Sequence, residues 1–394
     1  MGNKEIRLKD VLVIFRNGAS IKQLEGAEGL PITRIETISN ATIDMQKVGY
    51  ANIFNDKYQD YYLKEGDILL SHINSVTHLG KIAIYNNLSN KLIHGMNLLM
   101  LRANKNVVLP KYLYYVLGSK QFKRQLPKIT KKSVNQASIT ITDIGNLKLI
   151  IEENIVQQKK IINVLDKADE IRKKKKLAND KLDEFLKSTF ISMFGNPIIN
   201  SKKYESSLYG NEFTISSGGT PSTQKSEYWE DGNISWIGSN MCQNKVLSKN
   251  DGKFITDLGL SKSSAKIYKV GTILVALVGA TIGKTAFLKF ETTTNQNIAG
   301  IENNNPNKFN NVYIYYHLQN LYDLFMRIGS GKFKMANLTF VRNLPINIPP
   351  IDLQNQFAQI VEKVEAQKQK NELVIEQMNN LFNSLSQRAF NGKL

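Results

Sequence analysis

KEGDIL at residues 64–69 returns as KVGTIL at residues 269–274, and this repetition runs through the whole chain. Further pairs follow in the same order: YLYY at 112–115 with YIYY at 313–316, and ASIT at 137–140 with ANLT at 336–339. Each copy closes with a long helical pattern that opens with glutamines, QQ at 157–158 and QNQ at 354–356. Because the framework recurs while the loops differ in length, the sequence predicts two similar units, each a globular domain followed by a helix.

The predicted fold is α+β, with an internal pseudo-twofold repeat: two strand-rich mixed domains held apart by two long antiparallel helices that form a coiled coil. Runs of β-forming residues, such as 68–71 and 81–85, indicate paired strands, and Pro110 begins a helix. Apolar residues three and four apart predict helices over about 155–194 and 353–390. The predicted parts are domain 1 (1–150), helix 1 (151–195), domain 2 (196–351) and helix 2 (352–394).

The composition indicates a basic protein of a reducing compartment. Among 394 residues, 52 Lys and Arg outnumber 34 Asp and Glu, which gives a net charge of +18. Such a charge favours nucleic acid as the partner, and leaves a membrane surface or an acidic protein as alternatives. The single cysteine, Cys242, excludes an intramolecular disulfide. No apolar run approaches the roughly 20 residues that cross a bilayer, and no signal-peptide core follows residues 1–5, so we expect a cytoplasmic protein.

No motif predicts catalysis, a bound cofactor or a metal. GATIGKT at 279–285 resembles a phosphate-binding loop, but three residues separate its glycines where four are needed, and a strand follows it, so we expect a hairpin turn. The four histidines lack the spacing of metal ligands. An adenine methyltransferase would need a glycine-rich cofactor loop and a Pro-Pro-aromatic loop, and NPI at 196–198 supplies neither.

The order of these features resembles the specificity subunit of type I restriction-modification systems. The second half carries sequence motifs typical of that family: SGGTPS at 217–222, YW at 228–229 and GNISWI at 232–237. The helix ends, FGNP at 194–197 and FNGKL at 390–394, resemble the ends of the family's spacer regions. The first half departs from the pattern, with NGAS at 17–20 and a segment at 31–35 that lacks the tryptophan.

The resemblance implies two target-recognition domains, each reading half of a bipartite target in double-stranded DNA, with an unread gap set by the helix pair. Two modification subunits, which bind S-adenosylmethionine and methylate adenine, would assemble with this non-catalytic chain. Two restriction subunits that use ATP and magnesium would join them. The alternatives are a non-catalytic DNA-bridging scaffold with little sequence preference and a methyltransferase acting alone, which the absent motifs disfavour.

Polar loops between the predicted strands are the candidate base-reading elements, because Asn and Gln pair with adenine and Lys reaches guanine or phosphate. A solvated loop position is an equal alternative for each residue. Glycines 18 and 219 are expected to serve turns, and Trp229 and Trp236 to pack. The candidate DNA-binding residues are Lys22, Gln23, Ser39, Asn40, His72, Asn74, His78, Lys131, Lys132, Asn135 and Gln136 in the first domain, and Thr220, Thr223, Gln224, Lys225, Asn240, Gln243, Asn244, Asn295, Gln296, Lys332, Lys334 and Asn337 in the second.

Overall fold

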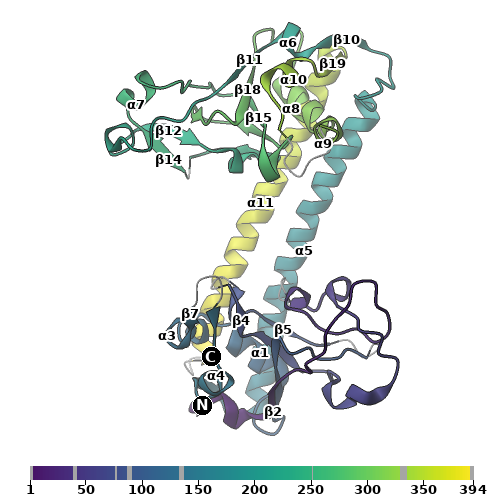
Figure 1. The fold of residues 1–394 in the computed structure, drawn as a ribbon, viewed down its shortest axis with the longest axis vertical. Helices are drawn as coiled ribbons and strands as arrows, with labels where there is room; N and C mark the ends of the chain where they lie inside the picture. Colours follow the sequence, from purple (N-terminus) through teal and green to yellow (C-terminus); the bar gives the residue numbers. More distant parts are fainter. Residues whose placement is uncertain are drawn as a thin grey trace. The chain divides into compact units, whose positions relative to one another are not determined.

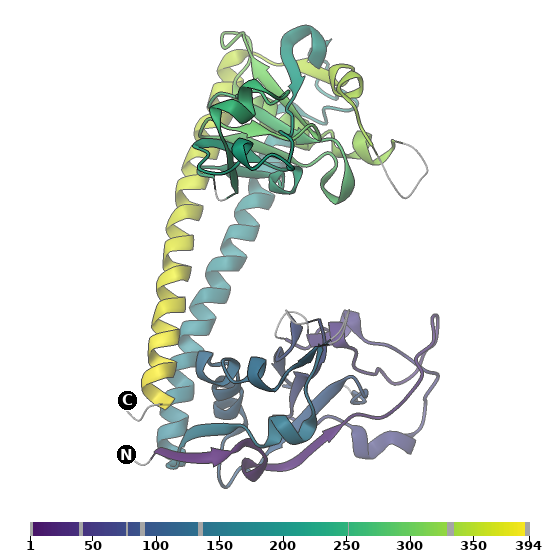
Figure 2. The same cartoon turned by 60° about the vertical axis from the view of Figure 1, so that its left-hand side comes forward.

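The computed structural model divides the chain into two compact units, each of which is described by itself (Figures 1 and 2). Unit 1 comprises residues 1–176 and 372–394, and unit 2 comprises residues 177–371. The structure describes residues 3–38, 42–75, 78–86, 91–132, 137–250, 252–328 and 335–390.

Unit 1 is built on a four-stranded antiparallel sheet of order β2-β6-β3-β5. Side chains alternate between its two faces, as a pleated strand requires: Ile68 and Leu70 join one core cluster, and Leu69 and Met100 join another. Strands β1 and β9 pair separately, and β4, β8 and β7 form a small sheet. The elements are β1 (Asn3–Arg7), β2 (Leu12–Asn17), β3 (Ile68–Ser71), β4 (Ile73–Asn74), β5 (Ile82–Ile84), β6 (Leu98–Ala103), α1 (Pro110–Gly118), α2 (Lys120–Lys123), α3 (Leu126–Ile129), β7 (Lys131–Lys132), β8 (Ala137–Ser138), α4 (Ile141–Gly145) and β9 (Lys148–Glu152).

Unit 2 repeats this plan and adds one strand to the main sheet. The order is β11-β18-β15-β16-β13, in which β13 runs parallel to β16. A second sheet, β14-β12-β17, carries the tryptophan-containing strand. The elements are β10 (Glu205–Leu208), α6 (Tyr209–Glu212), β11 (Phe213–Ser217), β12 (Ile234–Ile237), β13 (Lys245–Leu247), β14 (Lys253–Ile255), α7 (Asp257–Ser261), β15 (Ile273–Ala276), β16 (Thr285–Leu288), β17 (Thr293–Thr294), β18 (Ile298–Asn303), α8 (Asn311–Gln319), α9 (Tyr322–Met326), α10 (Leu338–Arg342) and β19 (Pro345–Ile348). Short 3₁₀ turns occur at Leu8–Val11, Ile35–Ile38, Met45–Lys47, Asp56–Tyr61, Ser226–Tyr228, Ser239–Met241 and Gly279–Thr281.

The backbone of the two units repeats down to single hydrogen bonds. Gly66 donates to the Tyr85 carbonyl (2.8 Å), and its counterpart Gly271 donates to the Leu288 carbonyl (2.9 Å). Both glycines have φ near +90° (91° and 89°), which a side chain would strain. The hairpin predicted at 279–285 is confirmed, because β15 and β16 pair antiparallel around it.

The repeat is out of register with our prediction near the end of each domain. The amide of Ile139 donates to the His72 carbonyl (2.9 Å), and the amide of Ala336 makes the same contact with the Leu277 carbonyl (2.8 Å). The helices that follow are capped by Thr140 and Asn337. Thr140 therefore corresponds to Asn337, and the alignment of ASIT with ANLT was wrong by two residues because it followed letters rather than caps.

Two helices of 40 residues follow the domains, α5 (Ile155–Phe194) and α11 (Ile351–Phe390). The fourth residue of each is a fully buried glutamine that binds the preceding domain through backbone atoms. Gln158 donates to the carbonyls of Val107 (3.0 Å) and Glu152 (2.7 Å) and accepts from the Leu109 amide (2.8 Å). Gln354 makes the same three contacts, which are with the Lys308 carbonyl (3.0 Å), the Pro349 carbonyl (2.9 Å) and the Asn310 amide (2.9 Å).

Within each unit α5 and α11 pack antiparallel, as predicted. In unit 2, Lys368 binds Asp183 (2.8 Å) and Asn371 donates to Asn179 (2.7 Å), so residue numbers rise on one helix as they fall on the other. In unit 1, Arg172 donates to Asn379 (3.3 Å). Arg172 and Lys368 occupy the same position of their helices, as do Asn379 and Asp183, so the repeat extends to the polar contacts between the helices.

Candidate nucleic-acid interface

Two tryptophans hold the loop that follows β11. The Trp236 indole N–H donates to the Gly219 carbonyl (3.0 Å), and the Trp229 N–H donates to the Ser222 carbonyl (3.1 Å). The two rings pack edge to face with centroids 5.2 Å apart, which confirms their structural role. The loop is thereby fixed while its polar side chains, those of Thr220, Thr223, Gln224 and Lys225, remain exposed.

A second predicted loop lies against this one. The Thr220 hydroxyl donates to Oε1 of Gln296 (2.7 Å), and both side chains are exposed. The Asn295 amide donates to the Ile237 carbonyl (3.2 Å) at the end of β12, and the Asn295 side chain accepts from the Asn297 amide (3.1 Å). Residues that the sequence places far apart therefore form one polar surface of hydroxyl and carboxamide groups, the kind that reads base edges.

The loop before β13 contacts a lysine that is not among the candidates predicted from the sequence. Gln243 is exposed, donates to the Asn240 carbonyl (3.2 Å) and accepts from Lys284 (3.3 Å). Lys284 belongs to the hairpin at 279–285, which resembles a phosphate-binding loop but lacks its spacing. A basic residue in a predicted hairpin was the sequence feature that could have identified it. Asn244 has a left-handed backbone (φ 55°), and its side chain accepts from the Thr285 amide (2.9 Å).

Several candidates of unit 1 lie in the small sheet β4-β8-β7, where Asn74 of β4 and Lys132 of β7 both pair with Ala137 of β8. Lys22, His78, Lys131 and Lys132 are exposed, and Gln23 accepts from Nε of Arg34. The Asn74 side chain accepts from the Ser75 amide (2.8 Å). In unit 2 the Asn337 side chain is likewise engaged, because it accepts from the Phe340 amide (2.8 Å) as the cap of α10. The remaining candidates, Ser39, Asn40, Asn135, Gln136, Lys332 and Lys334, lie outside the described residues.

His72 differs from the other candidates that the structure describes, because it is buried. Its side chain is 6% exposed, and burial lowers its pKa to about 4. Nδ1 of His72 has no hydrogen-bond partner in the described part of the chain. His94 is fully buried, and its pKa is also lowered to about 4, mainly by burial. Both rings are therefore neutral at pH 7 and carry no charge that could attract a phosphate.

The glycines at the start of these loops serve close approach, which corrects the expectation that they serve turns. Neither Gly18 nor Gly219 has a positive φ. A Cβ on Gly18 would lie 2.3 Å from the Gly95 carbonyl oxygen, and one on Gly219 would lie 2.5 Å from the Ser264 carbonyl carbon. Contact with the backbone, rather than dihedral angle, excludes a side chain at both positions.

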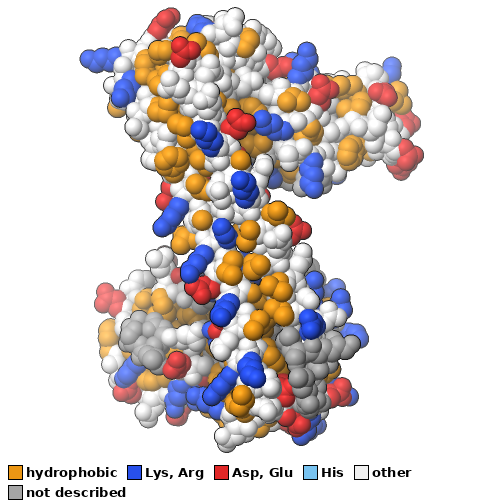
Figure 3. Space-filling model, turned by 180° about the vertical axis from the view of Figure 1, so that it is seen from behind, with side chains coloured by type: hydrophobic (Ala, Val, Ile, Leu, Met, Phe, Trp, Pro, Cys, Tyr) orange, Lys and Arg blue, Asp and Glu red, His pale blue; other side chains and the backbone are white. Residues whose placement is uncertain are grey.

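The basic charge is distributed rather than confined to a tail. Lys and Arg side chains are scattered over the visible face of both units and of the long helices (Figure 3). Among the described residues, no group of three or more His, Cys, Asp or Glu side chains is placed to hold a metal ion. None of the described helices combines the length and apolar character of a membrane span.

Comparison with known proteins gives consistent matches over most of the chain. The model of the type I restriction modification DNA specificity domain matches twice, over residues 2–184 and 189–377. The type I restriction enzyme MjaX specificity subunit of Methanocaldococcus jannaschii is 32% identical over 378 residues, which are 92% of this chain and 86% of the relative. The EcoKI specificity subunit of Escherichia coli K12 is 22% identical over 197 residues, 48% of this chain and 42% of the relative.

Solved structures support the fold. A chain from a structure on assembly and conformational transition of the type I restriction-modification system matches with a TM-score of 0.59 at 16% identity, covering 100% of this chain and 98% of that one. The S subunit of the type I system of M. genitalium matches with a TM-score of 0.55 at 15% identity, covering 99% and 96%.

Proposed function

Because the chain belongs to the family of type I restriction-modification DNA specificity subunits, we propose that it reads a bipartite DNA target, one half with each unit. The observation that supports this most directly is a repeated scaffold with non-repeated loops. Ala19 donates to the His94 carbonyl and Gly219 donates to the Thr294 carbonyl, both at 2.8 Å, so the loops begin from the same frame. The side chains on that frame differ, and so would the half-sites.

In unit 2 the reading surface would include two polar pairs, Thr220 with Gln296 and Gln243 with Lys284. The first pair offers a hydroxyl and a carboxamide beside the tryptophan-anchored loop, and the second offers a lysine for guanine or phosphate. A rigid support matters because base recognition depends on hydrogen-bond geometry. In unit 1 the exposed Lys22, His78, Lys131 and Lys132 would contact the DNA, mainly its phosphates.

The specificity role itself is non-catalytic, so the chemistry would come from partner subunits. We propose two modification subunits that bind S-adenosylmethionine and methylate adenine, and two restriction subunits that use ATP and magnesium. The long helices support two equivalent docking positions. Leu177 and Leu373 occupy matching positions of α5 and α11 and are 54% and 56% exposed, as Phe185 and Leu381 are at 49% and 44%. Exposed apolar side chains at helical spacing are typical of a surface that binds another helix.

Adenine-methylation mapping in host cells with and without this gene tests the proposal. Deletion should remove methylation at one asymmetric, gapped motif. The double substitution Thr220→Ala with Gln296→Ala should relax recognition in one half of that motif, by about 1–3 kcal/mol per lost base contact. Lys22→Ala with Gln23→Ala should act on the other half or on overall affinity. An unchanged methylome, with the modification partner expressed, would instead favour the DNA-bridging alternative.

The docking positions are tested separately by co-purification. Leu373→Glu with Leu381→Glu should release one modification subunit, and Leu177→Glu with Phe185→Glu should release the other. Gln377→Ala, an exposed position on α11, is the control and should retain both. Loss of both subunits from either pair would contradict two equivalent positions.

A further inference from the structure

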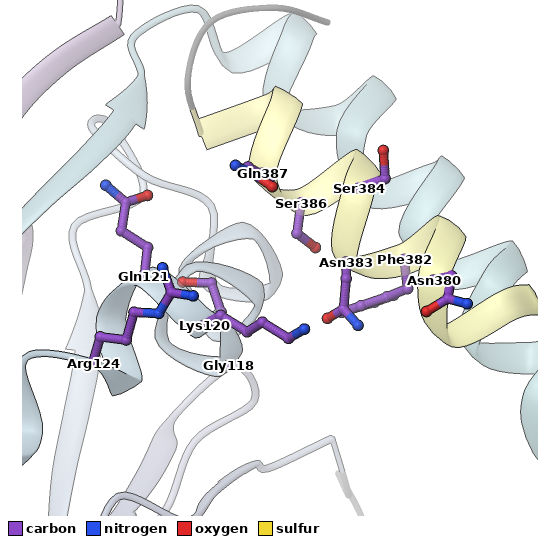
Figure 4. A pocket seen from close by; sticks show the side chains of 11 residues that line it. Gly118, Lys120, Gln121, Arg124, Asn380, Phe382, Asn383, Ser384, Ser386 and Gln387 are labelled. Atoms are coloured by element: carbon purple, nitrogen blue, oxygen red, sulfur yellow. The ribbon is translucent and has the colours of Figure 1, made fainter. Parts of the chain in front are cut away.

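Unit 1 contains a pocket of about 580 Å³ between the end of α1, the helix α2 and the last turns of α11. Every residue that lines it belongs to unit 1. Figure 4 shows Lys120 and Arg124 projecting from the side of α2, and Asn383, Ser386 and Gln387 projecting from α11. The volume is within the range of small-ligand sites.

The pocket coincides with a difference between the two long helices. Counted from the start of each helix, Ser386 of α11 occupies the position of Phe190 of α5. Phe190 is fully buried, and its ring packs against Tyr313, Phe194 and Phe357 with centroids 5.8, 4.9 and 5.5 Å away. A small hydroxyl side chain in unit 1 thus stands where unit 2 has an aromatic ring, and it lines a pocket.

The polar groups of the pocket indicate the chemistry of its ligand. Ser386 is 4% exposed, and its hydroxyl has no hydrogen-bond partner in the described part of the chain. Lys120 and Arg124 are exposed, and neither forms an ion pair with the described residues. The other polar lining side chains are hydroxyls and carboxamides, and none of the described residues that line the pocket carries a carboxylate. Two cations and an unused buried donor, in a described lining that contains no acidic side chain, are suited to an anion.

We propose that this pocket binds a phosphate group. Cations lie on the α2 side, and the Ser386 hydroxyl and Asn383 carboxamide lie on the α11 side, so donors face the cavity from two walls. A phosphate offers more acceptor oxygens than a carboxylate and directs them tetrahedrally rather than in one plane, so it can accept from both walls. The phosphate is that of a small phosphate-bearing molecule or of the DNA backbone, two sources that share this chemistry.

Calorimetric titration of the purified full chain with pyrophosphate and with ATP tests the proposal. One saturable site per chain is expected. Lys120→Ala with Arg124→Ala should weaken binding at least tenfold, and Ser386→Phe, which restores the residue of unit 2, should abolish it. The matched control is Lys123→Ala with Lys128→Ala, which removes the same charge from the same segment but from residues outside the pocket lining. Ser386→Ala removes the hydroxyl alone, and circular dichroism establishes that each variant is folded.

The two sources are separated by adding a DNA duplex to the titration. Competition by the duplex assigns the pocket to a backbone phosphate, and undiminished binding assigns it to a small molecule. Equal losses in the control pair, two sites per chain, or binding of glutamate as tight as that of pyrophosphate would each overturn the proposal. These results are independent of the methylation experiment, since neither partner subunits nor a target sequence are needed.

Discussion

Unit 1 and unit 2 share backbone hydrogen bonds and differ in the side chains at matching positions. The buried Thr272 of unit 2 corresponds to the buried Asp67 of unit 1, which forms an ion pair with the partly exposed Arg102 (2.7 Å). Leu277 corresponds to His72, and the aromatic cluster around Phe190 corresponds to the region of Ser386. At these three positions the side chains of unit 1, which are Asp67, His72 and Ser386, are more polar than their counterparts in unit 2. The comparison teaches that the same backbone hydrogen bonds and positive-φ glycines recur in both units even at positions where the neighbouring side chains differ.

The largest expected difference between the units concerns one matching position of the long helices, which is Phe190 in unit 2 and Ser386 in unit 1. Phe190→Ala should lower the free energy of unfolding of unit 2 by about 3–5 kcal/mol, because it leaves a cavity among packed rings. Ser386→Ala, at the matching position, removes an unpartnered hydroxyl and should change stability by less than about 1 kcal/mol. Denaturant unfolding of the full chain measures both. Similar losses in the two variants would show that the positions are not different in packing.

The next effect is the response to acid. Burial lowers the pKa of His72 and His94 to about 4 in unit 1 and that of His317 to about 3 in unit 2. Arg16 lowers the pKa of His94 further, against the Leu98 carbonyl and Asp67, which raise it. Since unfolded histidine titrates near 6.5, the unfolded chain binds more protons below that pH. The stability that depends on these neutral, buried rings is therefore fully present above about pH 6.5, and it falls as the pH is lowered towards 4.

Each histidine should cost about 1.4 kcal/mol per pH unit in this window. Unit 1, with two of them, should lose stability about twice as steeply as unit 2. Denaturant unfolding at pH 7.0, 6.0 and 5.0, with tryptophan fluorescence reporting on unit 2 and ring-proton NMR of His72 and His94 on unit 1, measures the slopes. Histidines that titrate near 6.5 in the folded chain would contradict the neutral buried rings.

The smallest effect concerns the polar contacts between α5 and α11. Asp183→Asn gives unit 2 the amide that unit 1 has at Asn379. Because the Asp183 carboxylate is half exposed, its ion pair with Lys368 should contribute less than about 1 kcal/mol. Denaturant unfolding at low and high salt should show a small loss that salt abolishes. A loss above 2 kcal/mol would mean that the ion pair holds the helices together in a way that unit 1 does not need.

The elements with strong periodicity were predictable, and the contacts that fix them were less so. The bounds of α5 and the start of α1 at Pro110 agree with the sequence pattern, because apolar spacing and proline act locally. The correspondence of Thr140 with Asn337 was not predicted from the sequence, because a helix cap depends on backbone geometry rather than on residue identity.

The candidate site shows the same limit. Sequence reasoning identified the polar loops, and the structure brings Thr220 and Gln296 together. It could not distinguish an available side chain from one that binds a nearby backbone amide, as Asn74 and Asn337 do, because asparagine favours turns and caps wherever it is found. Asn244 is engaged too, by the amide of the distant Thr285. Nor could sequence reasoning show that His72 is buried. The contacts of the candidate residues with DNA stay predictions.

The glutamines at the start of the long helices have a consequence for sequence change. Gln158 and Gln354 bind carbonyl and amide groups only, which every non-proline residue supplies in the same form. The residues that receive these bonds can therefore be exchanged without altering the attachment, as Leu109 and Asn310 illustrate. The glutamine itself cannot be exchanged, because a side chain of this length must both donate and accept hydrogen bonds. As long as these two of the 394 residues are kept, other residues of each domain can change while the domain keeps the same hydrogen bonds to its helix.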